Sequence, residues 1–154
     1  MTIAVRPLPE AQITPWIESE TLLYAAERMA NGESADASAE KARLSREENF
    51  PNDRPLASHT VLQVVSDGSP VGILWLGPRD SLHPDEWWVF SIDIDAEHQG
   101  KGFGRAAMGL AETVARERGA RTLGLNVFGN NPRAQNLYRS LDYTVTAMQM
   151  SKEL

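Results

Sequence analysis

Hydrophobic residues in the second half of the chain switch regularly between the spacing of a strand and the spacing of a helix. A strand-like run covers residues 87–94, and helical spacing follows over 106–118. A second strand-like run covers 122–128, and a second helical stripe covers 134–141. The closing run 143–151 again has strand character. Because alternation marks strands and a spacing of three or four marks helices, this half predicts strand, helix, strand, helix, strand.

The first half of the chain predicts two helices and a hairpin after a short opening strand. Thr14 followed by Pro15 is typical of a helix start, because proline fits the first helical position. The run Asp67-Gly68-Ser69-Pro70 is turn chemistry between two apolar runs, which indicates an antiparallel hairpin. The expected elements are a strand over 3–6, helices over 15–30 and 36–49, strands over 59–66 and 71–76, and a loop over 77–84.

These elements predict a mixed α/β (α+β) fold with one central sheet. The chain has 154 residues, of which 42% are hydrophobic and 23% charged. That length and composition suit one globular domain spanning residues 1–154. No internal repeat or low-complexity linker interrupts it, so a single core is expected.

Charge and cysteine content exclude several classes of function. The net charge is −6, which argues against a nucleic-acid partner because such a partner needs a basic face. The chain has no cysteine, so disulfides, thiolate zinc sites and a cysteine nucleophile are excluded. No apolar run approaches the roughly 20 residues that span a bilayer, and the first residues do not resemble a signal peptide. A cytoplasmic protein without a membrane partner is expected.

The most informative segment is Gln99-Gly100-Lys101-Gly102-Phe103-Gly104-Arg105. It joins the strand 87–94 to the helix 106–118, and its three glycines allow a ligand to approach the backbone closely. The helix points its free N–H groups and positive dipole end into the turn. Lys101 and Arg105 add positive charge there. The segment therefore predicts a site for a phosphate or diphosphate group.

Two familiar phosphate-binding motifs do not fit this turn. Residues 102–107 match the dinucleotide fingerprint G-x-G-x-x-A, a weak pattern by itself. That fingerprint needs an acidic residue about 20 positions further on, and the strand 122–128 has none. A Walker loop needs a Gly-Lys-Ser/Thr triplet, which the chain lacks.

Two further motifs give the chain its family resemblance. Gln99 to Gly104 matches Arg/Gln-x-x-Gly-x-Gly/Ala after a strand, and residues 125–143 contain the downstream pattern of a strand, Asn, Ala and Leu-Tyr. Both motifs, in this order and at this separation, resemble the GNAT superfamily of acetyl-coenzyme A-dependent acyltransferases. Leu74-Trp75 and Met150-Ser151-Lys152 resemble a bacterial subgroup. Asp142 departs from the family's usual glycine, and Asp tolerates a left-handed backbone better than most residues.

The resemblance implies a single GNAT-like domain with a mostly antiparallel central sheet flanked by helices. Its two central strands, here about 87–94 and 122–128, would splay apart to admit the cofactor arm. The diphosphate would rest on the turn, and the arm would pair with the strand backbone. The implied cofactor contacts are Ile92, Asp93 and Ile94 on the strand, Gln99, Gly100, Lys101, Gly102, Phe103, Gly104 and Arg105 at the turn, and Asn131 and Tyr138 downstream.

The resemblance also implies catalytic roles for residues of the cleft. Tyr138 matches the family's general acid, which protonates the departing thiolate, although its helical stripe fits a core residue equally well. An alkylammonium acceptor must lose a proton before it attacks. Glu86 is the first candidate for the base that removes this proton, and Asp93 is the second. The alternative for Glu86 is an ordinary solvent-exposed carboxylate beside Asp85.

The expected function is transfer of an acetyl group from acetyl-CoA to a primary amine, by direct attack in a ternary complex and without a metal. The acceptor is a small molecule or a peptide, and the chain is a monomer or a homodimer. The alternatives are a non-catalytic acyl-CoA-binding module and another kind of nucleotide-binding protein.

Overall fold

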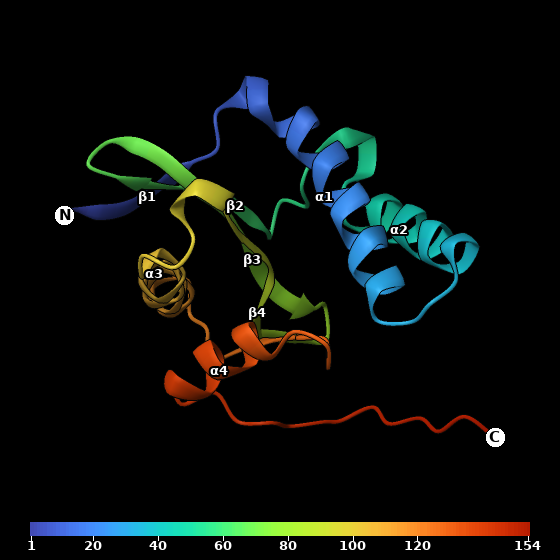
Figure 1. Ribbon diagram of the computed structural model, residues 1–154. Helices are drawn as coiled ribbons and strands as arrows, with labels where there is room; N and C mark the ends of the chain where they lie inside the picture. Colours follow the sequence, from blue (N-terminus) through green and yellow to red (C-terminus); the bar gives the residue numbers. More distant parts are fainter.

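A five-stranded sheet forms the centre of the molecule in the computed structural model, which describes residues 1–154 (Figure 1). The strands follow one another across the sheet in the order of the sequence. Neighbouring strands are antiparallel, except that the last pair is parallel. The strands are β1 (Ile3–Pro7), β2 (Thr60–Ser66), β3 (Ser69–Asp80), β4 (His83–Ile94) and β5 (Thr122–Leu125). The mixed fold with a mostly antiparallel sheet is therefore confirmed.

Helices flank the sheet on both sides (Figure 1). α1 (Glu10–Ala30) packs against α2 (Ala35–Asn49) on one side, and α3 (Phe103–Glu117) covers the other face. α4 (Pro132–Ser140) lies beside α3, to which it is tied by a hydrogen bond from Arg105 to Ser140. Two short 3₁₀ turns, Pro51–Asp53 and Ala96–His98, precede β2 and the glycine turn. No helix is both long enough and apolar enough to cross a membrane.

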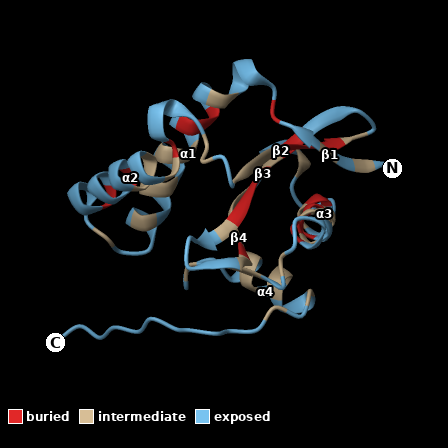
Figure 2. Cartoon of the chain, turned by 180° about the vertical axis from the view of Figure 1, so that it is seen from behind, coloured by how far each residue is buried: buried red, intermediate tan, exposed pale blue.

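Two apolar clusters, one on each face of the sheet, hold the layers together. The larger cluster joins the sheet to α3, whose small residues Ala107 and Ala111 are fully buried and let the helix lie close to the strands. The smaller cluster joins Trp75 of β3 to Trp16 and Ile17 of α1. The buried residues accordingly follow the strands and the inner side of α3 (Figure 2).

The hairpin between β3 and β4 is longer than the sequence pattern predicts. The expected loop over 77–84 is wrong, because pairing continues from Gly77 to the partners Asp80 and His83. The Asp80 carboxylate accepts hydrogen bonds from the backbone N–H groups of Leu82 and His83. Such a side-chain-closed turn reverses the chain within two residues, so the polar sequence here forms a hairpin end.

The first helix begins earlier than predicted. α1 starts at Glu10, directly after Pro9, and contains Pro15 in its interior, so the predicted start at Pro15 is wrong. Proline in a helix loses one backbone hydrogen bond and strains the turn before it. Burial of Trp16 and Ile17, the next two residues, offsets that cost and keeps the helix continuous.

The predicted final strand over 143–151 is also wrong. Residues 144–154 have no regular secondary structure and are all exposed, and β5 ends at Leu125 instead of residue 128. The chain runs clear of the body after α4 (Figure 1). Consequently β5 has a strand on one side only.

Candidate active site

The two central strands separate halfway along their length. The parallel ladder joins Glu86–Val89 of β4 to Thr122–Leu125 of β5. β4 then continues to Ile94, paired with β3 alone. The backbone edge of β4 from residue 90 to 94 therefore faces an opening, as the expected splaying requires.

A β-bulge in β4 decides which side chains face this opening from the α1 side. Trp75 pairs with Ser91 and Leu76 pairs with Val89, so Phe90 is an extra residue. Val89 lies in the α3 cluster, whereas Phe90 packs with Trp75 and Ser91 bonds to α1. A bulge adds one residue to the strand, so side chains beyond it point to the opposite face from the one that simple alternation predicts. Simple alternation predicts Val89, Ser91 and Asp93 on one face of the strand. That expectation is wrong for Val89, because beyond the bulge only Ser91 and Asp93 share the α1 face.

The glycine turn has the geometry of an anion cradle. Gly100 and Gly102 have φ values of 75° and 87°, in the region that favours glycine. The backbone N–H groups from Gly100 to Arg105 donate to no acceptor in the protein. A Cβ added at Gly102 would meet nothing within 4 Å, so space lies open above the turn. Six free amides at a helix start can hold a diphosphate without competing side chains.

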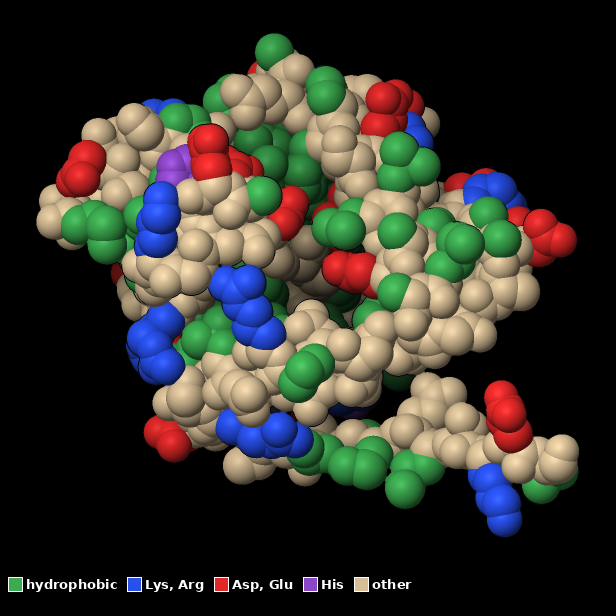
Figure 3. Space-filling view, in the orientation of Figure 1, with side chains coloured by type: hydrophobic (Ala, Val, Ile, Leu, Met, Phe, Trp, Pro, Cys, Tyr) green, Lys and Arg blue, Asp and Glu red, His purple; other side chains and the backbone are tan.

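Side chains around the turn fix its position between the sheet and α4. Gln99 donates from Nε2 to the carbonyl oxygen of Ile94 at 2.9 Å, and Arg133 Nη1 donates to Gln99 Oε1 at 3.3 Å. Arg105 Nη2 donates to the Ser140 hydroxyl at 2.6 Å. Lys101 is exposed at the turn. Basic side chains gather over this part of the molecule (Figure 3).

Acidic side chains border the cleft on its α1 side. The Ser91 hydroxyl donates to Glu20 Oε2 at 3.0 Å. Burial raises the pKa of Glu20 to about 7, and the charges of Glu27 and Asp93 raise it as well, against the lowering effect of the Ser91 bond. Burial also raises the pKa of Asp93. Acidic groups edge the hollow at the centre of this face (Figure 3). The arrangement suits a cationic guest and a proton acceptor that works near neutral pH.

The sequence analysis missed Glu20 and Glu27. They are seven residues apart on α1, two helical turns, and therefore share one face of the helix. This spacing was a usable signal in the sequence. Its meaning depends on Ser91 and Asp93 lying opposite, which only the packing of α1 on β4 reveals.

Tyr138 lies on the inner face of α4 and is partly buried against the α3 cluster. Its ring centroid is 6.1 Å from that of Tyr143. Burial raises the pKa of the Tyr138 phenol, and the charge of Glu27 adds to the effect. The phenol therefore stays protonated at neutral pH, as a proton donor must. Its packing also shows that the core interpretation and the donor role are compatible.

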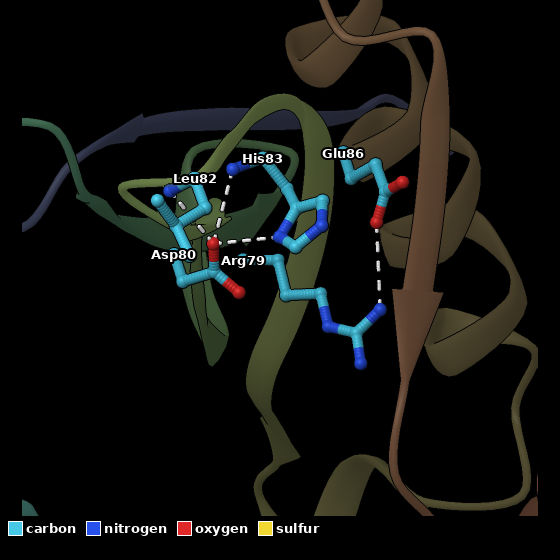
Figure 4. A network of polar contacts seen from close by, with 5 residues as sticks. All are labelled: Arg79, Asp80, Leu82, His83 and Glu86. Carbon is cyan, nitrogen blue, oxygen red and sulfur yellow. Dashed lines mark hydrogen bonds and ion pairs between the residues drawn. The ribbon is translucent and has the colours of Figure 1, made fainter.

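Glu86 and Asn131 lie in different surroundings. Glu86 sits in the paired part of β4, where its Oε2 is 3.4 Å from Arg79 Nη1. Figure 4 shows this pair beside the Asp80–His83 turn at the end of the hairpin. The Asn131 side-chain oxygen caps α4 by accepting from the N–H of Ala134 at 3.2 Å, which leaves its NH₂ group for another partner.

Comparison with known proteins identifies the family. The model of the acetyltransferase (GNAT) family matches residues 22–143. The chain belongs to this family. The uncharacterized N-acetyltransferase YdgE of Bacillus subtilis (strain 168) is 33% identical over 134 residues, and the match covers 85% of each chain.

Solved structures agree with the fold of this GNAT chain. The crystal structure of YycN from Bacillus subtilis superposes with a TM-score of 0.89 at 24% identity and covers 99% of both chains. AAC(6')-Iy in complex with the bisubstrate analogue CoA-S-monomethyl-acetylneamine superposes with a TM-score of 0.64 at 14% identity, covering 100% of this chain and 99% of that one. At these identities the structures show the fold.

The GNAT chain also has a cavity of about 960 Å³ around β5. Phe90 and Leu125, from the two splayed strands, and Tyr138 of α4 line it at the cleft end. The cavity continues along β5 to residues 143–147. No residue of the glycine turn lines it. Tyr138 thus borders a space to which the glycine turn does not contribute.

Proposed function

We propose that this protein transfers an acetyl group from acetyl-CoA to a primary amine. One arrangement around β4 carries the proposal. The strand leads at its end to the six free amides of the glycine turn, and its Ser91 hydroxyl donates a hydrogen bond to Glu20, a carboxyl group of raised pKa. A phosphate cradle at the end of β4 and a proton acceptor bonded to Ser91 of β4 would thus serve the same strand. The separation of β4 from β5 leaves room between them for an extended acyl carrier.

The donor would bind along backbone groups. Residues Gly100 to Arg105 would hold the diphosphate through their amides, with Lys101 supplying charge. The free edge of β4 at Ile92, Asp93 and Ile94 would pair with the amide-containing arm as an added strand does. The free NH₂ group of Asn131 would bond the same arm. These contacts use main-chain geometry, which explains the glycines of the turn.

Acetyl transfer would be a single displacement. The amine nitrogen attacks the thioester carbonyl carbon, a C–N bond forms, and the C–S bond breaks to release the thiolate. Tyr138 gives its phenolic proton to the sulfur. The absence of cysteine supports direct attack without a thiol acyl-enzyme. Most of the rate gain would come from holding amine and thioester together.

The amine proton needs an acceptor, and Glu20 is the best placed. Its pKa of about 7 leaves it partly ionised at neutral pH, whereas an ordinary carboxyl is too weak a base. Asp93 shares its face of β4 and is the second candidate. Glu86 pairs with Arg79 in the closed part of the ladder and is the third. The three carboxylates are separable by substitution.

The acceptor would be a cation. The charges of Glu27 and Asp93 raise the pKa of Glu20, and the charge of Asp93 raises the pKa of Glu27, so a positive guest among these three acids relieves their repulsion. AAC(6')-Iy, which shares the fold, was solved in complex with the bisubstrate analogue CoA-S-monomethyl-acetylneamine. We therefore favour polyamines, amino sugars and peptide amines over neutral or acidic acceptors.

An amine panel with detection of released thiol tests the proposal. The chain has no cysteine, so any new thiol reports free coenzyme A. We expect turnover with at least one cationic amine and a thermal shift with acetyl-CoA. A thermal shift without turnover would favour the non-catalytic binding module. Stabilisation by NAD or ATP in place of acetyl-CoA would contradict the proposal.

A further inference from the structure

The second half of α1 borders the cleft with few attachments to the rest of the molecule. The first half is anchored in the core, where Trp16 and Ile17 are buried. In the second half no residue from Thr21 to Ala30 is buried, and Leu22 and Met29 are 73% and 48% exposed. This half packs against α2, but burial in the core does not fix its position over the sheet.

The end of α1 is stiff in itself. Arg28 donates from Nε and Nη2 to the two carboxylate oxygens of Glu33 at 2.9 and 2.6 Å, and from Nη1 to the Tyr24 hydroxyl at 3.0 Å. The Glu33 N–H also donates to the carbonyl oxygen of Arg28 at 3.1 Å. Because the paired guanidinium ties the last turns of the helix to the turn that follows, residues 24–33 form one stiff piece. A single bond at the end of this piece can therefore set where all of it lies.

Asn130 makes such a bond from the loop between β5 and α4. Its Nδ2 donates to the carbonyl oxygen of Ala30, the last residue of α1, at 2.9 Å and across 100 positions of sequence. Carbonyl groups in the last turn of a helix have no partner within it and carry the negative end of its dipole, so an amide donor suits them well. No other hydrogen bond joins α1 to any residue beyond Ile94.

The loop that carries Asn130 is fixed to α4. Gln135 of α4 donates from Nε2 to the carbonyl oxygens of Phe128 and Gly129, at 3.0 and 3.1 Å. The same helix carries Tyr138. The Asn130 bond therefore links α4, with the proposed proton donor, to α1, with the acids of the cleft.

Glu27 is the acid that this bond affects most directly. It lies three residues before Ala30, less than one helical turn. Its charge raises the pKa of Tyr138, and the charge of Asp93 raises the pKa of Glu27, so the side chain lies near both groups. A shift of the helix end would move Glu27 relative to both of them. Displacements of about 1 Å are enough to impair a site of this kind.

We propose that Asn130 is a positioning residue, which holds the second half of α1 and its acids on the acceptor side of the cleft. The inference rests on the proposed function. Without the bond the helix end would leave this position for part of the time, and amine binding would have to restore it. The apparent affinity for the amine is then reduced by the fraction of molecules in which the helix is in place. The reacting groups of the bound complex are unchanged, so kcat is kept.

Amine kinetics of Asn130→Ala test the proposal. We expect the KM for the best amine of the panel to rise about fivefold, the effect of one hydrogen bond, with kcat and the dissociation constant for acetyl-CoA changed by less than about twofold. Asn130→Asp keeps the size of the side chain but places a carboxylate against the Ala30 carbonyl, so its KM should rise further. Asn136→Ala is the matched control, because this exposed asparagine of α4 makes no side-chain hydrogen bond. An unchanged KM in both Asn130 variants, or weaker binding of acetyl-CoA, would overturn the proposal.

Hydrogen exchange tests the bond without any amine. Backbone amides of residues 27–33 should exchange about fivefold faster in Asn130→Ala than in the natural chain or in Asn136→Ala. Amides of α3 should exchange equally in all three proteins, which shows that the variants fold. Equal exchange over 27–33 would contradict the positioning role. A natural chain that acetylates no amine would instead contradict the proposed function, and the exchange rates would still decide the role of Asn130.

Discussion

At the scale of single residues, Glu20 is the least ordinary group in the molecule. A carboxylic acid usually carries its charge at neutral pH, but burial raises the pKa of Glu20 to about 7. The Ser91 hydroxyl bonds the ionised form and works against that rise. A base is most effective when its pKa is close to the working pH. The pair therefore predicts a pH profile governed by Glu20 and tuned by Ser91.

Glu20→Gln removes the base without changing the size of the side chain. We expect kcat to fall about 100-fold at pH 7, the lower range for general base catalysis, with the affinity for acetyl-CoA unchanged. Ser91→Ala should keep activity and move the acidic limb of the kcat profile to higher pH, because the ionised form loses a hydrogen bond. If Glu20→Gln retains full activity and Asp93→Asn does not, Asp93 is the base.

Tyr138→Phe tests the proton donor. The substitution removes one hydroxyl from a partly buried ring, so we expect kcat to fall at least tenfold with little change in the dissociation constant for acetyl-CoA. Tyr143→Phe is the matched control, since its ring lies 6.1 Å away and its hydroxyl bonds Glu112. The control should lose about 1 kcal/mol of stability and keep its activity. Equal activity in both variants would remove Tyr138 from the mechanism.

At the scale of elements, local sequence predicts the backbone conformation well at the turns and helix ends. Gly100, Gly102 and Gly119 all have positive φ, as their positions at helix ends predict. Asp142 is left-handed too, so the expectation for this departure from the family is confirmed. These conformations follow from sterics between neighbouring atoms and need no distant contact.

The glycine turn predicts a contrast between the two glycines that flank α3, Gly102 before it and Gly119 after it. Gly102→Ala and Gly119→Ala both place a Cβ at φ near 90° with nothing within 4 Å, so both should cost about 1 kcal/mol of stability. Only Gly102→Ala puts a methyl group over the free amides. We expect it to weaken acetyl-CoA binding at least tenfold by calorimetry, and Gly119→Ala to bind normally. Equal affinities would count against the diphosphate cradle.

At the scale of the whole molecule, the acidic cleft opposes folding as pH rises. The folded chain holds Glu20 with a raised pKa, so its contribution to stability is present below the ordinary pKa of 4.5 and is lost as pH rises through about 7. Glu20→Gln cannot ionise and avoids this loss. The variant should match the natural chain in stability at pH 4 and exceed it by roughly 3 kcal/mol at pH 8, because the pKa is raised from 4.5 to about 7 and each pKa unit is worth 1.36 kcal/mol.

Thermal unfolding at the two pH values measures this difference. Asp85→Asn is a suitable control, because its carboxylate is exposed and paired with Arg121, so it should not gain stability at pH 8. A stability gain that is equal at both pH values would show that folding does not raise the pKa of Glu20. The same cleft would then need another proton acceptor.

The order and type of most elements follow from local sequence. Hydrophobic period and turn chemistry predicted the strands of the sheet, the amphipathic α3 and the glycine turn before it, since each depends on neighbours within a few residues. The family resemblance, confirmed by the match over residues 22–143, added the splayed strands. The errors at Pro15 and at residues 77–84 arose where distant contacts decide: the buried Trp16 and Ile17 keep the helix intact, and long pairing extends the hairpin.

The acidic side of the cleft was decided by tertiary structure. The bulge at Phe90 turns Ser91 and Asp93 toward α1, and α1 brings Glu20 to them across 71 positions of sequence. The raised pKa of Glu20 exists only because packing removes water from it. The sequence alone determined the free amides of the glycine turn, because backbone conformation there depends on neighbouring residues. The tertiary structure decided the pairing of Glu20 with Ser91 and left one edge of β5 unpaired, because both depend on which surfaces meet when the chain folds.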